Sequence, residues 1–553
     1  MPKVSSSCCL SNRASSGICE DWEIVGSSPD KKESIARKSR KDLYPGSHVA
    51  LGTTNETTTV THVVTTLTGT TTNPQGRDLD VSSLDTFRQS FDAAGRIAQN
   101  AAATHHSVRS LTTSRALLQS SLSPYFSVNL DQGGMPVTDQ KDSGRCWMFG
   151  TLNLFRFGTR DKLHLDDFEF SESYLLFYYL LEQVNFFLEF FLQTSQTDLD
   201  DRLLSNFLDN PVDDGGDWGI AVNLIQKYGL VPKDVYPESF SSSYTDELDA
   251  FLNQMVTHAA FEIRTTLNKG TTTTTTTNTK DNDDDKMEQA RRIKWKCVAQ
   301  CHRILTIHLG TPPMPNTSFD WHWRDMDGEF HVLSQITPQD FARNYVTVPY
   351  AHYVSLIQDP RNDYYQRYQV EYSMPICGGD PLIFLNIPAC EMKAMALKML
   401  QDGLPVFFAC IVENELDEET GLWDANLYEK TQFYGVSMIS MNKADRIRYG
   451  SSMGDHVMLF TGVDVSDDGT PRRWRVENSW GTEDAGNDGY FTMNDNWFDE
   501  NVFEVVAPPE YLSTDAKKGL DSPVRVLPAW DPMCSSSVAG KRTSRRKRRQ
   551  RRR

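Results

Sequence analysis

The sequence predicts an α+β fold with two lobes, one helical and one built mainly from strands. The segment that begins at Cys146 places apolar residues at helical spacing, and Tyr174–Phe191 is apolar on nearly every side, as in a buried helix. Farther along, Met453–Val463 and Trp474–Trp480 alternate with the period of two that is typical of strands. We therefore expect a helical lobe that carries Cys146 and a β lobe that carries the two later segments.

Residues 1–82 are predicted to be disordered. They are rich in Ser and Thr and poor in aromatic residues, with a charge-dense stretch at Asp30–Asp42 and a Thr tract at Thr53–Thr72. Regular structure is expected from Ser83. An amphipathic helix in this region is predicted by apolar residues at helical spacing, namely Phe87, Phe91, Ile97 and Ala101.

The stretch Gln140-Lys-Asp-Ser-Gly-Arg-Cys146-Trp147 places a possible thiol nucleophile shortly after a possible hydrogen-bond donor. A thiol attacks carbonyl carbons well only as the thiolate, so it needs a nearby imidazole and preferably the N-terminus of a helix. We expect Cys146 to begin a helix. The positive end of the helix dipole would then lie at the sulfur and lower its pKa.

Two downstream residues can supply the other groups that such a thiol needs. His456 can supply the imidazole, and Asn478 can hold the ring in its useful tautomer. Gln140 can donate its amide N–H to the oxyanion of the tetrahedral intermediate, beside the backbone N–H of Cys146. Taken singly, a buried Cys or an Asn is usually structural. Together, four roles with four candidates indicate a cysteine peptidase.

The sequence around the thiol also indicates a family. Gly144-Arg145-Cys146-Trp147 keeps the Gly, Cys and Trp of the papain-type signature and replaces its small residue by Arg. His456 follows Cys146 by about 310 residues, roughly twice the usual ~130–150, which indicates large insertions. From about Ser83 to Cys534 the chain resembles the bleomycin hydrolase family, the papain-like cysteine peptidases that include bacterial aminopeptidase C. The segments that carry this resemblance are Gln140–Trp147, Asp213–Trp218, Gln226–Lys233, Met441–Asp445, Trp474–Gly481 and Leu527–Met533.

The resemblance implies a papain-like fold, with a helical lobe, a β-barrel-like lobe and a large helical insertion at about residues 240–345. It implies that Trp480 shields the hydrogen bond between His456 and Asn478 from water. It also implies that Gly215 and Gly216 expose backbone for pairing with a peptide substrate, although a glycine pair by itself indicates an ordinary turn. The implied activity is removal of N-terminal residues from peptides and peptide-like amides through a thiol acyl-enzyme, with no cofactor. Family members are homohexamers, so a homo-oligomer is implied as well.

The expected insertion contains one tract that cannot bury a face. Thr271–Thr277 followed by Asp281–Asp285 is predicted to form a surface loop. The next stretch, Met287–His308, has the pattern of a helix. It contains Cys297, Cys301 and His302, but no second pair of ligands accompanies them, so no metal site is expected.

The composition is compatible with this fold without deciding it. The 553 residues are 39% hydrophobic. The ten Cys lack the close spacing of a secreted disulfide framework, and the sequence from Met1 does not have the pattern of a signal peptide. Reduced thiols and a cytoplasmic location are therefore expected. The longest apolar runs, such as Tyr174–Leu181, are far shorter than a membrane span, so no transmembrane helix is expected.

The C-terminal tail is the feature that this fold does not explain. Lys541–Arg553 contains ten Lys or Arg residues and no acid, whereas the whole chain has a net charge of −18. Such a run is typical of nuclear localisation, or of binding to nucleic acid or an anionic surface, and it could also associate with the acidic body. The alternative function is therefore a nucleic-acid or partner-binding protein with the peptidase body as a scaffold. Intact Gln140, Cys146, His456 and Asn478 favour the enzyme, because a scaffold has no need of all four.

The C-terminal arm leads to a further hypothesis. In the family that the chain resembles, this arm enters the cleft and limits substrates to those with a free amino terminus, because a carboxylate at its end can pair with the α-ammonium group. Trp530-Asp-Pro-Met533 fits the arm, but more residues follow it. We therefore hypothesise that the enzyme trims its own tail within Cys534–Lys541. The expected organisation is a disordered extension (1–82), a peptidase body (83–534) and a basic tail (535–553).

Overall fold

The computed structural model describes residues 81–90, 93–130, 135–269, 279–438, 441–483 and 486–533. All of these belong to one compact unit, residues 71–553, and residues 1–70 lie outside the described residues. The predictions made for the N-terminal extension up to residue 80, for Thr271–Thr277, for the trimming segment and for the basic tail also fall outside them.

Helices account for most of the first half of the described chain. In chain order the α-helices are α1 (Val81–Ser90), α2 (Ala93–His105), α3 (Val108–Thr112), α4 (Arg115–Ser121), α5 (Cys146–Leu163), α6 (Glu172–Gln193), α7 (Arg202–Leu208), α8 (Trp218–Tyr228), α9 (Phe240–Ser243), α10 (Asp246–Asn268), α11 (Thr279–Leu309), α12 (Pro338–Tyr345), α13 (Ala389–Gln401), α14 (Lys430–Tyr434), α15 (Lys443–Arg448), α16 (Asp495–Asn501) and α17 (Thr514–Gly519).

Strands dominate the second half. They are β1 (Val128–Asn129), β2 (Phe319–Arg324), β3 (Phe330–Ile336), β4 (Val354–Ile357), β5 (Arg367–Val370), β6 (Phe384–Asn386), β7 (Val406–Cys410), β8 (Leu416–Asp417), β9 (Leu422–Trp423), β10 (His456–Val465), β11 (Pro471–Glu477), β12 (Tyr490–Asn494), β13 (Val502–Ala507) and β14 (Arg525–Leu527). Short 3-10 turns occur at Tyr350–His352 and Pro509–Tyr511.

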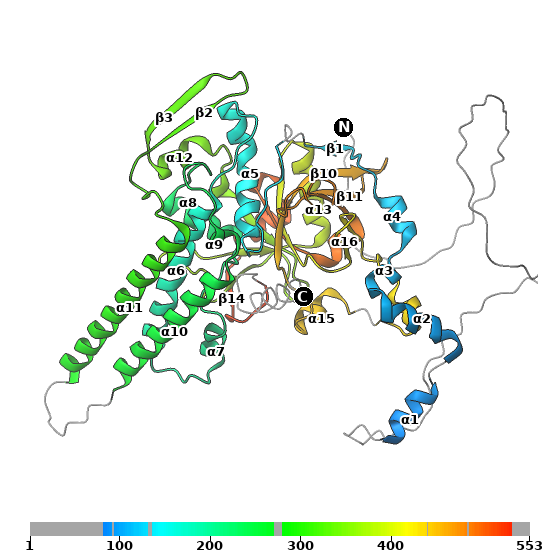
Figure 1. The fold of residues 1–553 in the computed structure, drawn as a ribbon, viewed down its shortest axis with the longest axis horizontal. Helices are drawn as coiled ribbons and strands as arrows, with labels where there is room; N and C mark the ends of the chain where they lie inside the picture. The colour runs from blue at the N-terminus through cyan, green and yellow to red at the C-terminus, as the bar shows by residue number, and fades with distance from the viewer. Residues whose placement is uncertain are drawn as a thin grey trace, which may run out of the picture. The chain divides into compact units, whose positions relative to one another are not determined.

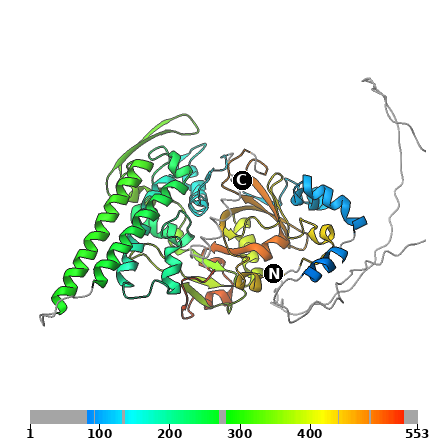
Figure 2. The same ribbon diagram turned by 60° about the horizontal axis from the view of Figure 1, so that its bottom comes forward.

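The helical lobe is built around α6. Ser171 begins this helix by accepting a hydrogen bond from the backbone N–H of Tyr174 over 3.0 Å. Helices α10 and α11 pack against each other and against α6, and they run side by side away from the sheet (Figures 1 and 2). The buried helix predicted over Tyr174–Phe191 is therefore confirmed.

Within the part of the chain that the structure describes, α6 is the one helix long and apolar enough to span a membrane. Of its most apolar window, 78% is buried inside the protein, so α6 is a core helix. The apolar run Tyr174–Leu181 is only part of this helix, which has 22 residues. The helix continues past Leu181 through the buried residues Glu182 and Gln183, and Glu182 accepts hydrogen bonds from Lys227 and Tyr228.

The β lobe is a mixed sheet with β10 at its centre. Over the described residues its strand order is β14-β5-β6-β4-β13-β7-β10-β11-β12-β9-β8, and β1 pairs with β10 in addition. Strand β10 is antiparallel to both β7 and β11. Hairpin β2–β3 forms a separate sheet of two strands, which lies beside the helical lobe (Figure 1).

The two faces of β10 belong to two different hydrophobic cores. Val457 and Leu459 pack in the core shared with the helical lobe, whereas Met458 and Phe460 pack in the core of the β lobe. This alternation confirms the period of two predicted for Met453–Val463. In the second predicted strand, Trp474 and Val476 share the β-lobe core. That strand ends at Glu477, so Asn478 follows it and does not lie within it.

Helix α5 packs directly on the central strands of this sheet. A Cβ atom on Gly150 would lie 2.6 Å from Cγ1 of Val457, so the helix and β10 approach each other more closely than any side chain at position 150 would allow. The same helix contacts β7. This close approach brings the first residue of α5 to the start of β10.

One expectation about local structure is wrong. The periodic residues from Phe87 to Ala101 lie in helices α1 and α2 as far as the structure describes them, and residues 91–92 between these helices lie outside the described residues. The acidic stretch Asp281–Asp285 was expected in a loop but lies in the first turns of α11. Acidic residues near a helix N-terminus interact favourably with its dipole, and this explains the difference.

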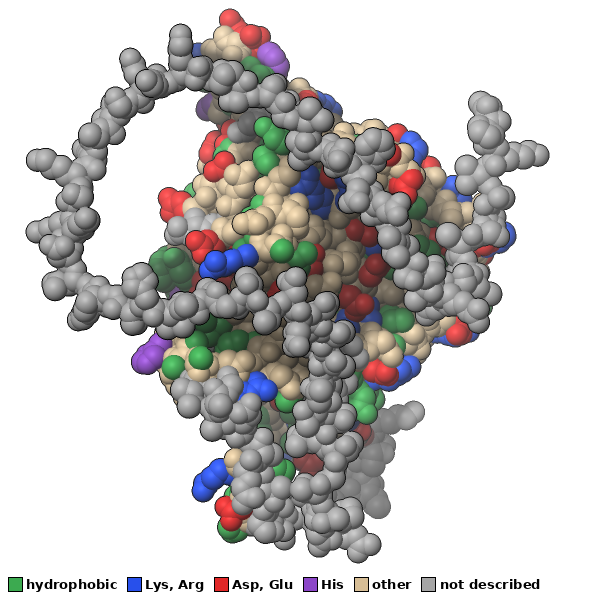
Figure 3. All heavy atoms as spheres, turned by 90° about the vertical axis from the view of Figure 1, so that its right-hand side faces the viewer, with side chains coloured by type: hydrophobic (Ala, Val, Ile, Leu, Met, Phe, Trp, Pro, Cys, Tyr) green, Lys and Arg blue, Asp and Glu red, His purple; other side chains and the backbone are tan. Residues whose placement is uncertain are grey.

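The segment that joins α3 to α4 is bonded to the β lobe. Ser114 donates its backbone N–H to the carbonyl oxygen of Leu427 over 2.8 Å, and Glu429 donates to Thr112 over 2.7 Å. Helix α1 begins at Val81, so the expected boundary after residue 82 falls inside this helix. On the described part of the face shown in Figure 3, acidic and basic side chains both occur across the surface.

Candidate active site

Cys146 is the first residue of α5, as predicted, and only 7% of it is exposed. The helix can begin here because Arg145, its N-cap residue, accepts the first backbone bonds, with 2.8 Å to the N–H of Met148 and 3.0 Å to that of Phe149. The thiol therefore lies at the positive end of an 18-residue helix.

His456 and Asn478 are brought together as predicted. His456 is the first residue of β10, and Asn478 directly follows the neighbouring strand β11. The ring Nε2 of His456 lies 2.8 Å from Oδ1 of Asn478, and both residues are buried. The same Oδ1 accepts the backbone N–H of Ser479 over 2.8 Å, which fixes the amide orientation. An amide oxygen can only accept, so Nε2 carries the proton and Nδ1 carries the lone pair in the neutral ring.

Trp480 covers this hydrogen bond from one side. Its ring centroid lies 5.1 Å from that of His456 with the planes inclined by 37°. A large apolar ring at this distance limits the access of water to the His456–Asn478 bond. The arrangement agrees with the shielding role implied for Trp480.

Gln140 is tied to the segment that carries Asn478. Its backbone N–H donates to the carbonyl oxygen of Ser479 over 2.9 Å, and its side-chain Oε1 accepts from Oγ of Ser479 over 2.6 Å. One hydrogen of its Nε2 is donated to the carbonyl oxygen of Ser143 over 2.6 Å. The side-chain amide is therefore held in one orientation, between the loop before Cys146 and the loop after Asn478.

The environment of the thiol differs from expectation. Burial, with smaller contributions from the carboxyl groups of Asp455 and Asp214, raises the pKa of Cys146 to about 12. Backbone N–H groups of Val457 and Trp147 act in the opposite direction but are weaker. The expected lowering by the helix dipole is thus outweighed, because burial of the sulfur disfavours the charged thiolate. The interaction with Val457 also places the sulfur beside the residue that follows His456.

The glycine pair lies against the catalytic loop. A Cβ atom on Gly216 would lie 2.4 Å from the Trp147 ring, so only glycine fits there. The backbone N–H of Gly215 donates to Asp213 over 2.9 Å, and its carbonyl oxygen accepts from the hydroxyl of Tyr179. Both groups of Gly215 therefore have partners inside the protein, but its carbonyl oxygen has a second lone pair with which it can accept another hydrogen bond.

Sequence reasoning missed a buried ion pair between the two lobes. Nη2 of Arg156, on α5, lies 2.8 Å from Oε1 of Glu477, and both side chains are at most 1% exposed. Glu477 directly precedes Asn478, so the helix that carries the thiol is joined to the segment that carries the amide. The only signal in the sequence was the position of Glu477 beside the motif, since no local pattern connects it with a residue far upstream.

Other clusters of ligand-type side chains lie away from this site. Cys297 and Cys301 are buried on α11 with their sulfurs 4.0 Å apart, and the helix predicted to contain them is confirmed. His164, Asp325 and Asp327 have ligand atoms within 4.8 Å of one another at the β2–β3 turn. In that turn Asp325 already accepts backbone N–H bonds and a bond from His331, so its role is to close the hairpin.

Comparisons with known proteins assign this arrangement to a family. The Peptidase C1-like family matches residues 78–534. The chain belongs to this family. Human bleomycin hydrolase is 36% identical over 445 residues, which cover 79% of this chain and 93% of that protein. Aminopeptidase C of Lactobacillus delbrueckii subsp. lactis is 37% identical over 443 residues, with the same shares covered.

A solved structure supports the fold in the same way. The crystal structure of PepW from Lactobacillus rhamnosis matches with a TM-score of 0.75 at 35% identity, over 83% of this chain and 99% of that one. The family membership and this likeness confirm a papain-like α+β fold and a cysteine-type peptidase. They give no support to the alternative of a binding protein that uses the peptidase body as a scaffold.

Proposed function

We propose that this cysteine peptidase is an aminopeptidase and amide hydrolase of the bleomycin hydrolase type, which removes N-terminal residues from peptides and peptide-like amides. The observation that carries the proposal is the hydrogen bond between His456 Nε2 and Asn478 Oδ1. The next residue, Ser479, is hydrogen-bonded to Gln140, so the same loop also holds the oxyanion donor. The names of the relatives, bleomycin hydrolase and aminopeptidase C, support the substrate class.

The geometry supports a specific division of roles. Nδ1 of His456 accepts the thiol proton as the sulfur of Cys146 attacks the scissile carbonyl carbon. The carbonyl oxygen becomes an oxyanion, which receives hydrogen bonds from the Gln140 side chain and the backbone N–H of Cys146. The imidazolium then donates its proton to the leaving amine, and a thioester remains on Cys146. Water, deprotonated by the same imidazole, hydrolyses this thioester and releases the acid product.

The free thiols and the resemblance lead to three further parts of the proposal. We propose a cytoplasmic enzyme, because the six cysteines of the described residues are free thiols and a thiol nucleophile needs a reducing compartment. We propose a homohexamer on the resemblance alone, which light scattering of the purified protein would test. The basic run Lys541–Arg553 would add contacts to nucleic acid or an anionic surface, and salt-dependent retention on heparin would test this.

The deciding experiment is hydrolysis of fluorogenic amides by wild type and Cys146→Ala. Wild type should hydrolyse aminoacyl and peptide amides with a free amino terminus much faster than their N-blocked counterparts. Cys146→Ala should be inactive on all of them. Cys390→Ala is the matched control, because Cys390 is exposed and should leave the rate unchanged. Full activity in Cys146→Ala, or equal rates on free and blocked substrates, would contradict the proposal.

A further inference from the structure

Arg145 is a fully buried cation directly before the nucleophile. The peptide bond between Arg145 and Cys146 carries the backbone N–H that serves as an oxyanion donor in the proposed function. Whatever fixes Arg145 therefore fixes the direction of that N–H. Papain-type signatures have a small residue at this position, so the arginine calls for an explanation.

The guanidinium of Arg145 forms a two-pronged ion pair with Glu238. Nη1 lies 2.9 Å from Oε1, and Nη2 lies 2.8 Å from Oε2. Burial raises the pKa of the Glu238 carboxyl, but the arginine outweighs it and the pKa lies below its ordinary value. Glu238 also accepts a hydrogen bond from Oγ of Ser242 over 2.6 Å. Ser242 and Ser239 form a capping box at the start of α9, so the carboxylate is held by an ordered segment.

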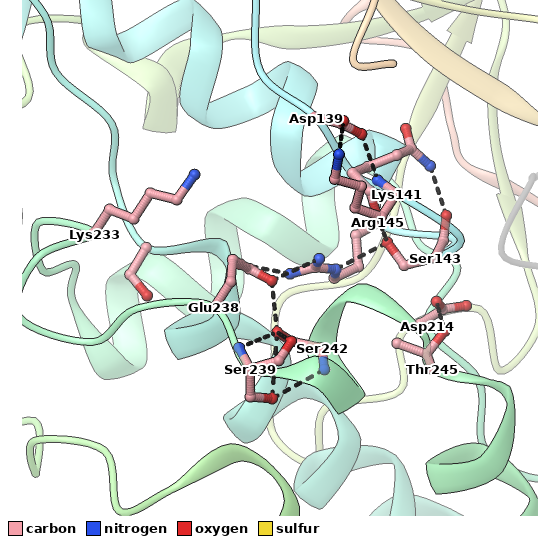
Figure 4. A network of polar contacts seen from close by, with 12 residues as sticks. Asp139, Lys141, Ser143, Arg145, Asp214, Lys233, Glu238, Ser239, Ser242 and Thr245 are labelled. Carbon is pink, nitrogen blue, oxygen red and sulfur yellow. Dashed lines mark hydrogen bonds and ion pairs between the residues drawn. The ribbon is translucent and has the colours of Figure 1, made fainter. Parts of the chain in front are cut away.

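The other edge of the guanidinium leads to the second oxyanion donor. Nε of Arg145 donates to Oγ of Ser143 over 3.0 Å, and that hydroxyl donates to the carbonyl oxygen of Gln140 over 2.6 Å. The side chain of Gln140 returns a bond to the carbonyl oxygen of Ser143. A continuous chain of hydrogen bonds therefore connects Glu238 with Gln140. Figure 4 shows its part from Glu238 through Arg145 to Ser143.

Asp214 holds the same loop through a second set of hydrogen bonds. Asp214 accepts the backbone N–H of Gly144 and the hydroxyl of Thr245, and its carbonyl oxygen accepts the indole N–H of Trp147 over 2.8 Å. Thr245 lies seven residues after Glu238 in the sequence, at the start of α10. The segment 238–245 thus contacts the catalytic loop directly at Arg145 and, through Asp214, at Gly144. Figure 4 shows Glu238, Asp214 and Thr245 around this loop.

We propose that Arg145 and Glu238 are positioning residues that hold the two oxyanion donors, the Gln140 side chain and the Cys146 backbone N–H, in their catalytic geometry. The ion pair does not stabilise the thiolate, because the guanidinium charge is neutralised by Glu238 and burial still raises the pKa of Cys146 to about 12. The inference rests on the proposed function. A merely structural ion pair would affect unfolding alone, so the two roles can be separated by experiment.

The test compares two reagents that make different demands on the site. A peptide aldehyde adds the thiol across its C=O bond: an S–C bond forms, the π pair moves to the oxygen, and the thiol proton ends on the imidazole or on that oxygen. Its affinity therefore reports on the oxyanion donors. Iodoacetamide alkylates the sulfur with loss of iodide and forms no oxyanion, so its rate reports only on the thiol.

The informative variants are Glu238→Gln and Ser143→Ala. Each should lower kcat by about 10-fold to 100-fold, within the range for a misplaced oxyanion donor, and weaken aldehyde inhibition by a similar factor. KM and the alkylation rate should change less than about threefold, because neither depends on the oxyanion. Lys294→Gln is the matched control. It removes another ion pair of the helical lobe, 2.7 Å from Glu189 and with the lysine 6% exposed, and should leave both readouts unchanged.

The outcomes separate the two proposals. Variants that unfold like wild type and bind the aldehyde as tightly as wild type would overturn the positioning role. If Glu238→Gln does not fold, Ser143→Ala decides, since it removes one hydroxyl and leaves the ion pair in place. A wild-type protein that neither hydrolyses amides nor binds the aldehyde would overturn the proposed function and this inference with it.

Discussion

The hydrogen bond from His456 to Asn478 decides which ring nitrogen serves as the base. Because Nε2 donates to Oδ1 over 2.8 Å, the lone pair of the neutral ring is on Nδ1. Asn478 therefore acts on the ring without taking part in proton transfer. Gln140 acts on a different species, the oxyanion, and is held by Ser143 and Ser479.

These roles predict a graded response to mutation. His456→Ala should reduce kcat more than Asn478→Ala, because the histidine transfers the proton, whereas the asparagine only orients the imidazole ring. Gln140→Ala should lower kcat by about 10²–10³ with a smaller effect on KM. Steady-state kinetics on a free-amine aminoacyl amide measures all three, with circular dichroism as a check on folding. Equal and complete losses in the three variants would indicate misfolding and contradict the division of roles.

The burial of Cys146 predicts that its alkylation rate depends differently on pH in the absence of His456. Burial raises the pKa of Cys146 to about 12, so at neutral pH the thiolate forms only when His456 accepts the thiol proton, and in His456→Ala the thiol should remain protonated. Its reaction with iodoacetamide should be slower than in wild type at pH 7. The rate should then rise as the pH approaches 12, because the thiolate fraction grows with pH. Labelling rates followed by mass spectrometry in a Cys390→Ala background test this, and an equal rate in both proteins at pH 7 would contradict it.

At this scale the sequence was sufficient to select candidate residues that the fold then brings together, since their types and order follow from the chemistry of thiol catalysis. It was not sufficient for the pKa of Cys146. That value depends on burial and on Asp455 and Asp214, which the fold brings to the sulfur from distant positions. The partners of Arg145 were hidden for the same reason, because Glu238 lies 93 positions away in the chain.

Helix α5 is the element that joins the two lobes. Arg145 at its start is paired with Glu238 beside α9, and Arg156 farther along is paired with Glu477 at the end of β11. Nη2 of Arg156 also donates to the carbonyl oxygen of Pro136 over 3.0 Å. The helix is thus fixed by buried charges at two points along its length.

The pair between Arg156 and Glu477 predicts strong coupling in a double-mutant cycle. Arg156→Met or Glu477→Leu alone should lower the free energy of unfolding by about 3–5 kcal/mol, because each leaves an uncompensated buried charge. The double variant should be clearly more stable than the sum of the single effects predicts. Chemical denaturation measures this, with Arg343→Gln as an exposed control whose partner is Asp340. Additive losses would show that the two residues act independently.

The elements themselves were predictable where their pattern was long and regular. The alternation over β10 and the apolar sides of α6 were sufficient to place both. The position of Asp281–Asp285 was not, because composition alone indicates solvent exposure, whereas acids in the first turns of a helix are also stabilised by its dipole. The end of β11 at Glu477, one residue before Asn478, could not be predicted either, because an alternating pattern does not mark the last residue of a strand.

On the scale of the whole molecule, the C-terminal arm is anchored to both lobes. Strand β14 pairs with β5, the guanidinium of Arg202 lies 4.4 Å from the Trp530 ring, and Nη2 of Arg361 lies 2.7 Å from Oδ1 of Asp531. Met533 is buried in the core of the helical lobe. The sequence predicted that these residues form an arm, but its anchors come from residues far upstream and could not be predicted.

Loosening this arm should change substrate selection. Arg361→Gln removes the ion pair with Asp531, so an arm that restricts the cleft to free amino termini would be held less firmly. The ratio of kcat/KM for N-blocked to free amides should rise at least about threefold, while the rate on free amides changes less. Arg343→Gln again serves as the control. An unchanged ratio, together with an intact mass that still ends at Arg553, would contradict a selecting role for the arm.

The contact between Gly150 and Val457 has a consequence for how this protein can vary. Strand β10 lies between two cores, so its alternate residues pack against different neighbours. Val457 and Leu459 pack on the side of α5, whereas Met458 and Phe460 pack in the β-lobe core. Gly150→Ala should by itself destabilise the protein, since the added methyl would lie 2.6 Å from Val457. Val457→Ala should restore stability, whereas Met458→Ala should not. In a library selected for activity, substitutions along this strand should therefore separate into two sets. Those at Val457 and Leu459 should be compensated by changes in α5, and those at Met458 and Phe460 by changes in the β-lobe core.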